Sequence, residues 1–448
     1  MSWGSSEGGP SAHNGARSLR FGHGHDQSVN SLKGGTQVPA TRYRVLFGAC
    51  LTQFTVIGML FAYGLFFNPL EEEFGWSRTF LSSTSALAFF MMGVLAIFAG
   101  RLNDRLGPRV VMGFAGLAYG IGFLLFSQVS APWQMYAIFG VFIALGLGAH
   151  DVVTLSTIAR WFPEQRGIMS GVVKTGTAVG QMAMPPIAAY LLLSYGWRQA
   201  LIVLGVGTLI LMCVAALSMK RPPTPAAADA ALAQTGFDFT QARGTRVFWM
   251  LCAIQFTFFP SMMTVPTHLA VHGTDLGMTT AVASTLLSVL GATSIGGRLV
   301  VGTIADRIGA KMAFLMCFVV LLSSLTAFVA VSSHGLLYVV VAFYGFSHGG
   351  LFTVVSPLVA EYFGMRAHGA IFGVILFFGT IGGAIGPIVA GRIFDVLGSY
   401  DLAFTMLAVL AAIGLTLVVA LPKRESVAVR AIKRPRARPD RCERGPRP

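Results

Sequence analysis

Long apolar stretches recur along this chain, and short polar segments separate them. Each stretch holds about 20 residues, the length of a helix that crosses the hydrocarbon core of a bilayer. Helices are the expected elements, because the alternating pattern of membrane strands is absent and lipid cannot satisfy open backbone groups. The pattern predicts twelve spans, at residues 45–68, 79–100, 110–129, 133–158, 167–193, 199–219, 247–270, 279–303, 312–332, 335–359, 369–391 and 402–421.

The second six spans repeat the first six at an offset of 202 residues. "GRLNDRLGPR" at 100–109 aligns with "GTIADRIGAK" at 302–311, and several glycines and a proline keep the same register elsewhere. One register held over six spans indicates a duplicated unit. An even number of spans keeps the two copies parallel, related by an axis along the membrane normal. The expected fold is an all-α membrane protein with two pseudo-symmetric six-helix bundles.

Composition and charge support a membrane location. Hydrophobic residues make up 54% of the chain and charged residues only 11%, whereas soluble proteins carry about 25% charged residues. Lysine and arginine concentrate in both tails and in the even-numbered loops, while the odd-numbered loops hold only Arg78, Arg198 and Arg392. The positive-inside rule then places both termini in the cytoplasm. The net charge of +14 is therefore a sign of topology and of contact with anionic lipid, and not of nucleic-acid binding.

These patterns divide the chain into five segments and favour the plasma (inner) membrane. We expect a disordered cytoplasmic tail, a first bundle, a cytoplasmic linker rich in proline and alanine, a second bundle and a basic cytoplasmic tail, at residues 1–43, 44–219, 220–246, 247–421 and 422–448. The five cysteines show no pairing pattern, so a disulfide scaffold is not expected.

Three charged residues lie inside the predicted spans: Asp151, Lys174 and Arg298. Each is eight or nine residues from a cytoplasmic marker, which places all three about 12–14 Å deep, near the bilayer midplane. Such charges cost about 2.5–3.5 kcal/mol each on insertion scales, and they face a cavity or pair with one another. Lys174 belongs to the first half and Arg298 to the second, so an anion between the halves would meet both. A guanidinium binds a carboxylate through two parallel bonds.

Two interpretations of Lys174 stay open at this stage: it faces the substrate together with Arg298, or it pairs with Asp151. Asp151 is either a counter-ion or a proton carrier. His268, His348 and Tyr63 also lie within spans and are candidates for substrate binding. The alternatives are helix–helix hydrogen bonds for the histidines and an interfacial position for the tyrosine.

The paired "G-x-x-x-D-R-x-G" loops resemble the signature loop of the major facilitator superfamily. "YGLFFNPLEEEFGWSR", "ARWFPEQRGIMSG", "GWRQA" and "GGAIGPIVAGRIFDVLGSYDLAF" are similar to its monocarboxylate transporter and oxalate/formate antiporter branch. The resemblance implies two bundles around a central substrate cavity that opens alternately to each side. It also implies that the paired loops latch the halves on the cytoplasmic side, through Gly100, Asp104, Arg105, Gly107, Asp306, Arg307 and Gly309.

The same resemblance implies that Arg298, in "GGRLVVG" on span 8, binds a carboxylate. Ser294 stands where animal monocarboxylate carriers have a carboxylate one turn before the arginine. Span 11, "GAIFGVILFFGTIGG", lacks the lysine that pairs with the second carboxylate of oxalate. Either Lys174 supplies a second positive charge from span 5, or the substrate has one carboxylate.

The expected function is secondary active transport of small organic anions, above all monocarboxylates, by proton symport or anion exchange. The alternatives are a dicarboxylate antiporter of the oxalate/formate type and a carboxylate sensor that does not transport. We expect no enzymatic activity, cofactor or metal, because no nucleotide loop, zinc helix or nucleophile elbow is present. The expected partners are the substrate anion, protons and the lipid bilayer, with the chain acting as a monomer.

Overall fold

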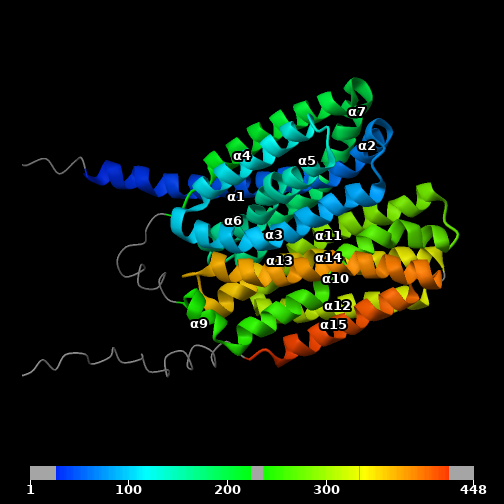
Figure 1. The fold of residues 1–448 in the computed structure, drawn as a ribbon. Coiled ribbons are helices and arrows are strands. Elements are labelled where there is room, and N and C mark those ends of the chain that lie inside the picture. The colour runs from blue at the N-terminus through cyan, green and yellow to red at the C-terminus, as the bar shows by residue number, and fades with distance from the viewer. Residues whose placement is uncertain (1–26, 223–235, 332, 423–448) are drawn as a thin grey trace, which may run out of the picture. The chain divides into compact units, whose positions relative to one another are not determined.

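The structure is a computed structural model that describes residues 27–222, 236–331 and 333–422 (Figure 1). Most of the two predicted tails and the middle of the predicted linker therefore lie outside the described residues. Contacts divide the chain into residues 1–42 and residues 43–448. The packing below concerns the second of these units.

The first half of the chain is helical throughout. Its elements are α1 (Gln27–Ala62), η1 (Tyr63–Phe66), α2 (Phe67–Phe74), α3 (Arg78–Leu106), α4 (Pro108–Phe126), α5 (Pro132–Ala137), η2 (Ile138–Ile143), α6 (Ala144–Trp161) and α7 (Arg166–Ser218). The segment η2 is a π-helix that joins α5 and α6 into one span.

The second half repeats this organisation. Its elements are α9 (Phe239–Arg243), α10 (Arg246–Asp275), α11 (Thr280–Ile308), α12 (Ala310–Ala330), α13 (His334–Phe363), α14 (His368–Leu397) and α15 (Asp401–Ala420). Within the described ranges the β-structure amounts to an isolated bridge between Gly236 and Gly364. The short helix α9 lies within the predicted linker, residues 220–246.

Eleven helical segments of the described chain are long and apolar enough to cross a membrane. One of them, α7, has 53 residues, which corresponds to about 80 Å of helix. Gly196, with φ 76°, interrupts its helical backbone, at a conformation that glycine adopts without a Cβ penalty. The break separates the predicted spans 167–193 and 199–219, so twelve spans are present as predicted.

The observed helices extend further than the predicted spans. α1 begins at Gln27, so helix occupies part of the tail that was expected to be disordered over 1–43. A helix satisfies its backbone groups internally, and it therefore continues past the apolar stretch that the hydropathy pattern detects. Hydroxyl caps begin several helices: Thr245 Oγ1 accepts from the amide of Phe248 at 3.2 Å, and Ser77 Oγ accepts from Phe80 at 3.2 Å.

The outer surface of the helices is apolar. Large side chains such as Phe98, Phe114 and Leu193 are 59%, 62% and 88% exposed, while Asp151 and Lys174 are buried. A contiguous apolar exterior around buried charges reverses the usual order of a soluble protein. This distribution fits an integral membrane protein.

Two helix pairs make the most extensive contacts between the halves: α3 packs against α14, and α7 packs against α11. The 202-residue offset relates these pairs, since α3 corresponds to α11 and α7 to α14. Small residues make the approach close, as at Gly100, where an added Cβ would lie 2.0 Å from the carbonyl oxygen of Gly369. Helices that pack through backbone can separate and re-form as units.

Candidate functional site

A buried guanidinium lies where the two halves touch. Arg298, on α11, is 2% exposed, and its Nε and Nη1 atoms have no hydrogen-bond partner among the described residues. α7 contacts α11 at this level, where a Cβ on Gly171 would lie 2.2 Å from the Arg298 carbonyl oxygen. Buried charges are normally paired, because a buried charge without a partner is costly. The unused donors of Arg298 therefore make it a candidate for binding an anion.

Lys174, on α7, is paired within the first half. Its Nζ atom lies 2.6 Å from Oδ1 of Asp151 on α6, and the two side chains are only 4% and 9% exposed. The same Nζ lies 5.2 Å from the ring centre of Phe352, which belongs to α13 of the second half. The geometry thus presents the ion pair with Asp151, one of the two interpretations that the sequence left open. Lys174 also reaches the boundary of the other half.

A glutamine that the sequence reasoning missed completes this arrangement. Gln53, on α1, donates from Nε2 to Oδ1 of Asp151 at 2.8 Å and to Oγ1 of Thr154 at 3.0 Å. Its Oε1 accepts from the hydroxyl of Thr177 at 2.8 Å. The signal in the sequence was a polar residue within the apolar run "LTQFTVIG". The sequence reasoning considered only ionisable residues, so it missed Gln53, which is fully buried in the structure. Three helices of the first half therefore hold the Asp151 carboxylate.

The second half contributes His348 and Phe352 from α13 beside Arg298. His348 Nδ1 lies 3.4 Å from Oγ of Ser294, one helical turn before Arg298 on α11. The rings of His348 and Phe352 are 5.1 Å apart, edge to face. We call Arg298, Lys174, Asp151, His348 and Phe352 the charged cluster, since the cation–π contact of Lys174 links its two halves.

Tyr63 and His268 lie in other surroundings. The Tyr63 hydroxyl donates to the Leu81 carbonyl at 3.1 Å and lies 2.8 Å from Thr84 Oγ1. His268 Nδ1 lies 3.0 Å from the Tyr400 hydroxyl, and Nε2 lies 3.2 Å from the Pro387 carbonyl. Each side chain joins helices within one half, which is the alternative use that the sequence allowed for the histidine.

The paired signature loops bind the opposite halves. Asp104 Oδ1 accepts from Arg160 Nη2 at 2.5 Å, and its Oδ2 accepts from the backbone amide of Ala370, at the start of α14, at 3.1 Å. Asp306 accepts from the amides of Gly167 and Ile168, at the start of α7, at 2.7 and 2.8 Å. Each aspartate thus caps a helix of the other half, where the helix dipole favours negative charge. We call these contacts the latch.

The other signature residues shape the turns. Gly107 and Gly309 both have φ 91° and end α3 and α11. The side chains of Arg105 and Arg307 are exposed. The latch role of Arg307 therefore stays a prediction, while Asp306 binds the backbone amides of Gly167 and Ile168 on α7.

His368 is a second residue that the sequence reasoning missed. It is fully buried at the start of α14, and its Nδ1 lies 3.0 Å from Oγ of Ser156 on α6 of the first half. Its Nε2 lies 3.0 Å from the Ser356 carbonyl on α13. A carbonyl can only accept, so Nε2 carries the proton and Nδ1 accepts from the serine. His368 therefore ties the halves together beside the latch.

Substituting Asp306 by asparagine is expected to weaken the latch by about 0.3–1 kcal/mol, because asparagine keeps an accepting oxygen but loses the negative charge that the helix dipole favours. The population that is open at the latch should rise several-fold. The measurement is the rate at which an impermeant maleimide labels Ser156→Cys from the latch side, against a background without that cysteine. Asp275→Asn, at the far end of α10, is the matched control. An unchanged labelling rate would contradict the role of Asp306.

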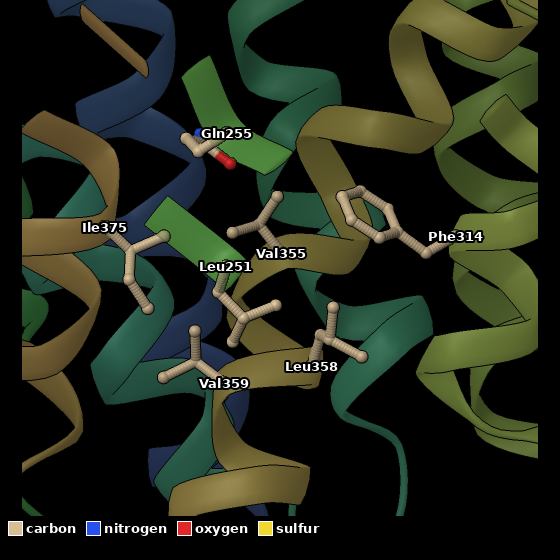
Figure 2. A pocket seen from close by; sticks show the side chains of 7 residues that line it. All are labelled: Leu251, Gln255, Phe314, Val355, Leu358, Val359 and Ile375. Carbon is tan, nitrogen blue, oxygen red and sulfur yellow. The ribbon is translucent and has the colours of Figure 1, made fainter. Parts of the chain in front are cut away.

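Figure 2 shows a different kind of pocket, inside the second half. Leu251, Gln255, Phe314, Val355, Leu358, Val359 and Ile375 line it. Six of these side chains are apolar and none is charged, so the pocket offers nothing that neutralises an anion. The described residues contain no group of three or more His, Cys, Asp or Glu side chains placed to hold a metal ion.

Curated relatives of the chain are transporters. It is 25% identical over 390 residues to monocarboxylate transporter 13 of Rattus norvegicus, covering 85% of this chain and 89% of that protein. It is 27% identical over 380 residues to monocarboxylate transporter 3 of the same species, covering 80% and 76%. The uncharacterized MFS-type transporter YhjX of Escherichia coli (strain K12) is 24% identical over 330 residues, covering 72% and 81%.

Solved structures show the same fold at low sequence identity. The proton:xylose symporter XylE superimposes with a TM-score of 0.72 at 13% identity, covering 86% of this chain and 96% of that one. The human organic anion transporter MFSD10 (TETRAN) gives a TM-score of 0.64 at 17% identity, covering 85% and 99%.

The family model described as Major Facilitator Superfamily matches residues 49–326 and 274–443. Together the two matches cover both halves, in agreement with the duplicated loops and the paired aspartate caps. The chain belongs to the major facilitator superfamily of membrane transporters.

Proposed function

We propose that this protein is a secondary active transporter of small monocarboxylates, with Arg298 as the residue that binds the carboxylate. The observation that carries the proposal is the buried guanidinium whose Nε and Nη1 atoms have no hydrogen-bond partner in the described part of the chain. Each of these two N–H groups is a charged donor that a carboxylate oxygen can accept. Identity of about a quarter to proteins named monocarboxylate transporters supports the substrate class.

The surroundings of Arg298 suit a small anion with an apolar part. His348 lies within electrostatic range of Arg298 and offers a ring nitrogen, while Phe352 presents an aromatic face between His348 and Lys174. One strong charge with a few polar groups and an aromatic wall is a common plan for small-molecule sites. Tyr63 and His268 take no part in this proposal, because their polar atoms bond within the protein.

The substrate would bind between the halves and be released when they separate. Arg298 is enclosed in this conformation, and the latch joins the halves on the side that the charge pattern assigns to the cytoplasm. Release to the cytoplasm then requires that Asp104 and Asp306 leave the helix ends that they cap. The repeat symmetry supplies a matching motion for opening to the other side.

The proposal includes two alternative mechanisms that could drive transport, proton symport and anion exchange. Asp151, with its partners Lys174 and Gln53, acts as the counter-ion of the lysine, and its carboxylate is the group available for proton coupling. We further propose that both termini lie in the cytoplasm, on the strength of the positive-inside pattern, and that the protein acts as a monomer in the plasma (inner) membrane.

Purified protein in sealed proteoliposomes should exchange labelled monocarboxylate. The test loads vesicles with lactate, pyruvate, formate, propionate or oxalate and follows counterflow of the labelled anion, with and without a pH gradient. Stimulation by an inward proton gradient identifies symport, and stimulation by internal anion alone identifies exchange. A sensor or an enzyme would move no label across a sealed membrane. Absence of counterflow for every small carboxylate, from protein that remains folded, would refute the proposal.

A further inference from the structure

The charged cluster contains two cations but one carboxylate. Arg298 and Lys174 are positive, and Asp151 is negative. The nearby ionisable groups are His150, whose Nε2 lies 3.5 Å from Asp151 Oδ1, and His348. With both histidines neutral, one net positive charge remains. We propose that Asp151 sets the valence of the transported anion: it cancels the charge of Lys174, so that the site accepts one carboxylate and disfavours two. This inference rests on the proposed function and narrows it.

The two cations, Lys174 and Arg298, differ in the contacts that they make. Lys174 is bound at 2.6 Å to a carboxylate that is itself buried, whereas two donors of Arg298 find no partner among the residues that the structure describes. A dicarboxylate that used both cations would have to draw Lys174 away from Asp151. The Asp151 carboxylate would then stay buried without its cation, and a buried charge left in that way is strongly unfavourable. A monocarboxylate at Arg298 leaves the ion pair intact.

Gln53 is the positioning residue that keeps Asp151 in place. Because the Thr177 hydroxyl donates to its Oε1 at 2.8 Å, the amide must direct Nε2 toward Asp151 and Thr154. The carboxylate therefore has a neutral donor as well as its cation. All of these groups belong to α1, α6 and α7, so the first half carries the arrangement with it during any movement against the second half.

Thr177 and Gln53 also explain why Asp151 pairs with Lys174 and not with Arg298. Asp151 Oδ1 accepts from both Lys174 and Gln53, so the carboxylate is directed at Lys174. Its interaction with Arg298 is electrostatic. Arg298 thus remains available to the substrate, although an aspartate lies in the same cluster. An Asp151 that paired with Arg298 instead would block the proposed carboxylate site.

A charge series tests the inference with three-carbon acids of equal length. Proteoliposomes that contain wild-type protein, Asp151→Asn, Lys174→Gln or the double variant take up labelled propionate or malonate. Asp151→Asn gives the site two positive charges, Lys174→Gln leaves none, and the double variant returns to one. The malonate-to-propionate uptake ratio should rise about tenfold or more in Asp151→Asn, because a unit charge a few ångströms away changes affinity by at least that order.

The double variant is the decisive control. If net charge governs valence, its malonate-to-propionate ratio returns to within about twofold of the wild-type ratio, although its absolute rate is lower. Lys174→Gln should raise the half-saturation concentration for propionate about tenfold without admitting malonate. A ratio in the double variant that stays at the Asp151→Asn value would overturn the inference, as would an unchanged ratio in a folded Asp151→Asn.

The folding of each variant is checked by monodisperse elution of the purified protein. Where Asp151→Asn fails to fold, the double variant carries the test, since it buries no unpaired lysine; loss of propionate uptake from a folded double variant overturns the inference. Failure of this inference is distinct from failure of the proposed function. If only the inference about valence fails, wild-type protein transports propionate, but the malonate-to-propionate ratios of the variants do not follow the charge of the site. If the proposed function fails, wild-type protein transports no monocarboxylate.

Discussion

Arg298→Gln is expected to abolish monocarboxylate uptake, with a loss greater than about a hundredfold. Two charge-assisted hydrogen bonds to the carboxylate are worth about 3 kcal/mol or more together, which corresponds to this factor. Glutamine is two bonds shorter than arginine and carries no charge, so it restores neither the reach nor the charge of the guanidinium. Initial uptake rates and half-saturation concentrations in proteoliposomes measure the effect.

The same substitution should leave the protein as stable as the wild type, or more so. Arg298 is a buried cation without a hydrogen-bond partner at two of its donors, and such a charge is costly inside a membrane. Thermal unfolding of purified Arg298→Gln should therefore occur at or above the wild-type temperature. Arg246→Gln, an exposed arginine at the start of α10, is the matched control and should transport normally. A folded Arg298→Gln that transports like wild type would remove Arg298 from the site.

Gly171→Leu is expected to hold the protein open on the latch side and to stop transport. A Cβ at Gly171 would lie 2.2 Å from the carbonyl oxygen of Arg298 and 2.9 Å from its carbonyl carbon. These are backbone atoms, so the clash is relieved when α7 and α11 move apart and not by a rotamer change. Overpacking of this kind costs about 1–3 kcal/mol, which shifts a two-state equilibrium about 5- to 150-fold. Uptake should fall by at least tenfold.

The open state can be detected by cysteine labelling. Maleimide added from the latch side should modify Ser156→Cys faster in Gly171→Leu than in the parent, because Ser156 is buried against His368 of the other half when the latch is closed. Gly207→Leu, on the same helix α7, is the control, since nothing lies within 4 Å of a Cβ added there. Equal labelling and normal transport in Gly171→Leu would show that α7 and α11 need no close contact.

The depth of the charged residues in the membrane could be predicted from the sequence, whereas the direction in which each side chain faces could not. Hydropathy predicted the twelve spans, and residue counting placed Asp151, Lys174 and Arg298 at a common depth. The pairing of Lys174 with Asp151 and the unpartnered state of Arg298 depend on how each helix is rotated. Sequence spacing does not report that rotation when a helix is apolar on nearly all sides.

Polar but uncharged residues were the weakest point of the sequence reasoning. Gln53 and His368 make hydrogen bonds over long sequence separations, to Asp151 and to Ser156 respectively. No local sequence pattern predicts such contacts. The aspartates of the paired loops were predicted to latch the halves. That each one caps a helix of the opposite half became apparent only when α7 and α14 were seen beside the loops.

The binding of a carboxylate by Arg298 is tested most directly by equilibrium competition on the purified protein. Labelled lactate is bound to wild-type protein and to Arg298→Gln, and unlabelled lactate or lactamide is added as the competitor. The two competitors have nearly the same shape, but lactamide lacks the charge. The account predicts saturable binding to wild-type protein that lactate displaces and lactamide does not, and no binding to Arg298→Gln. Equal competition by lactamide, or undiminished binding to folded Arg298→Gln, would contradict it.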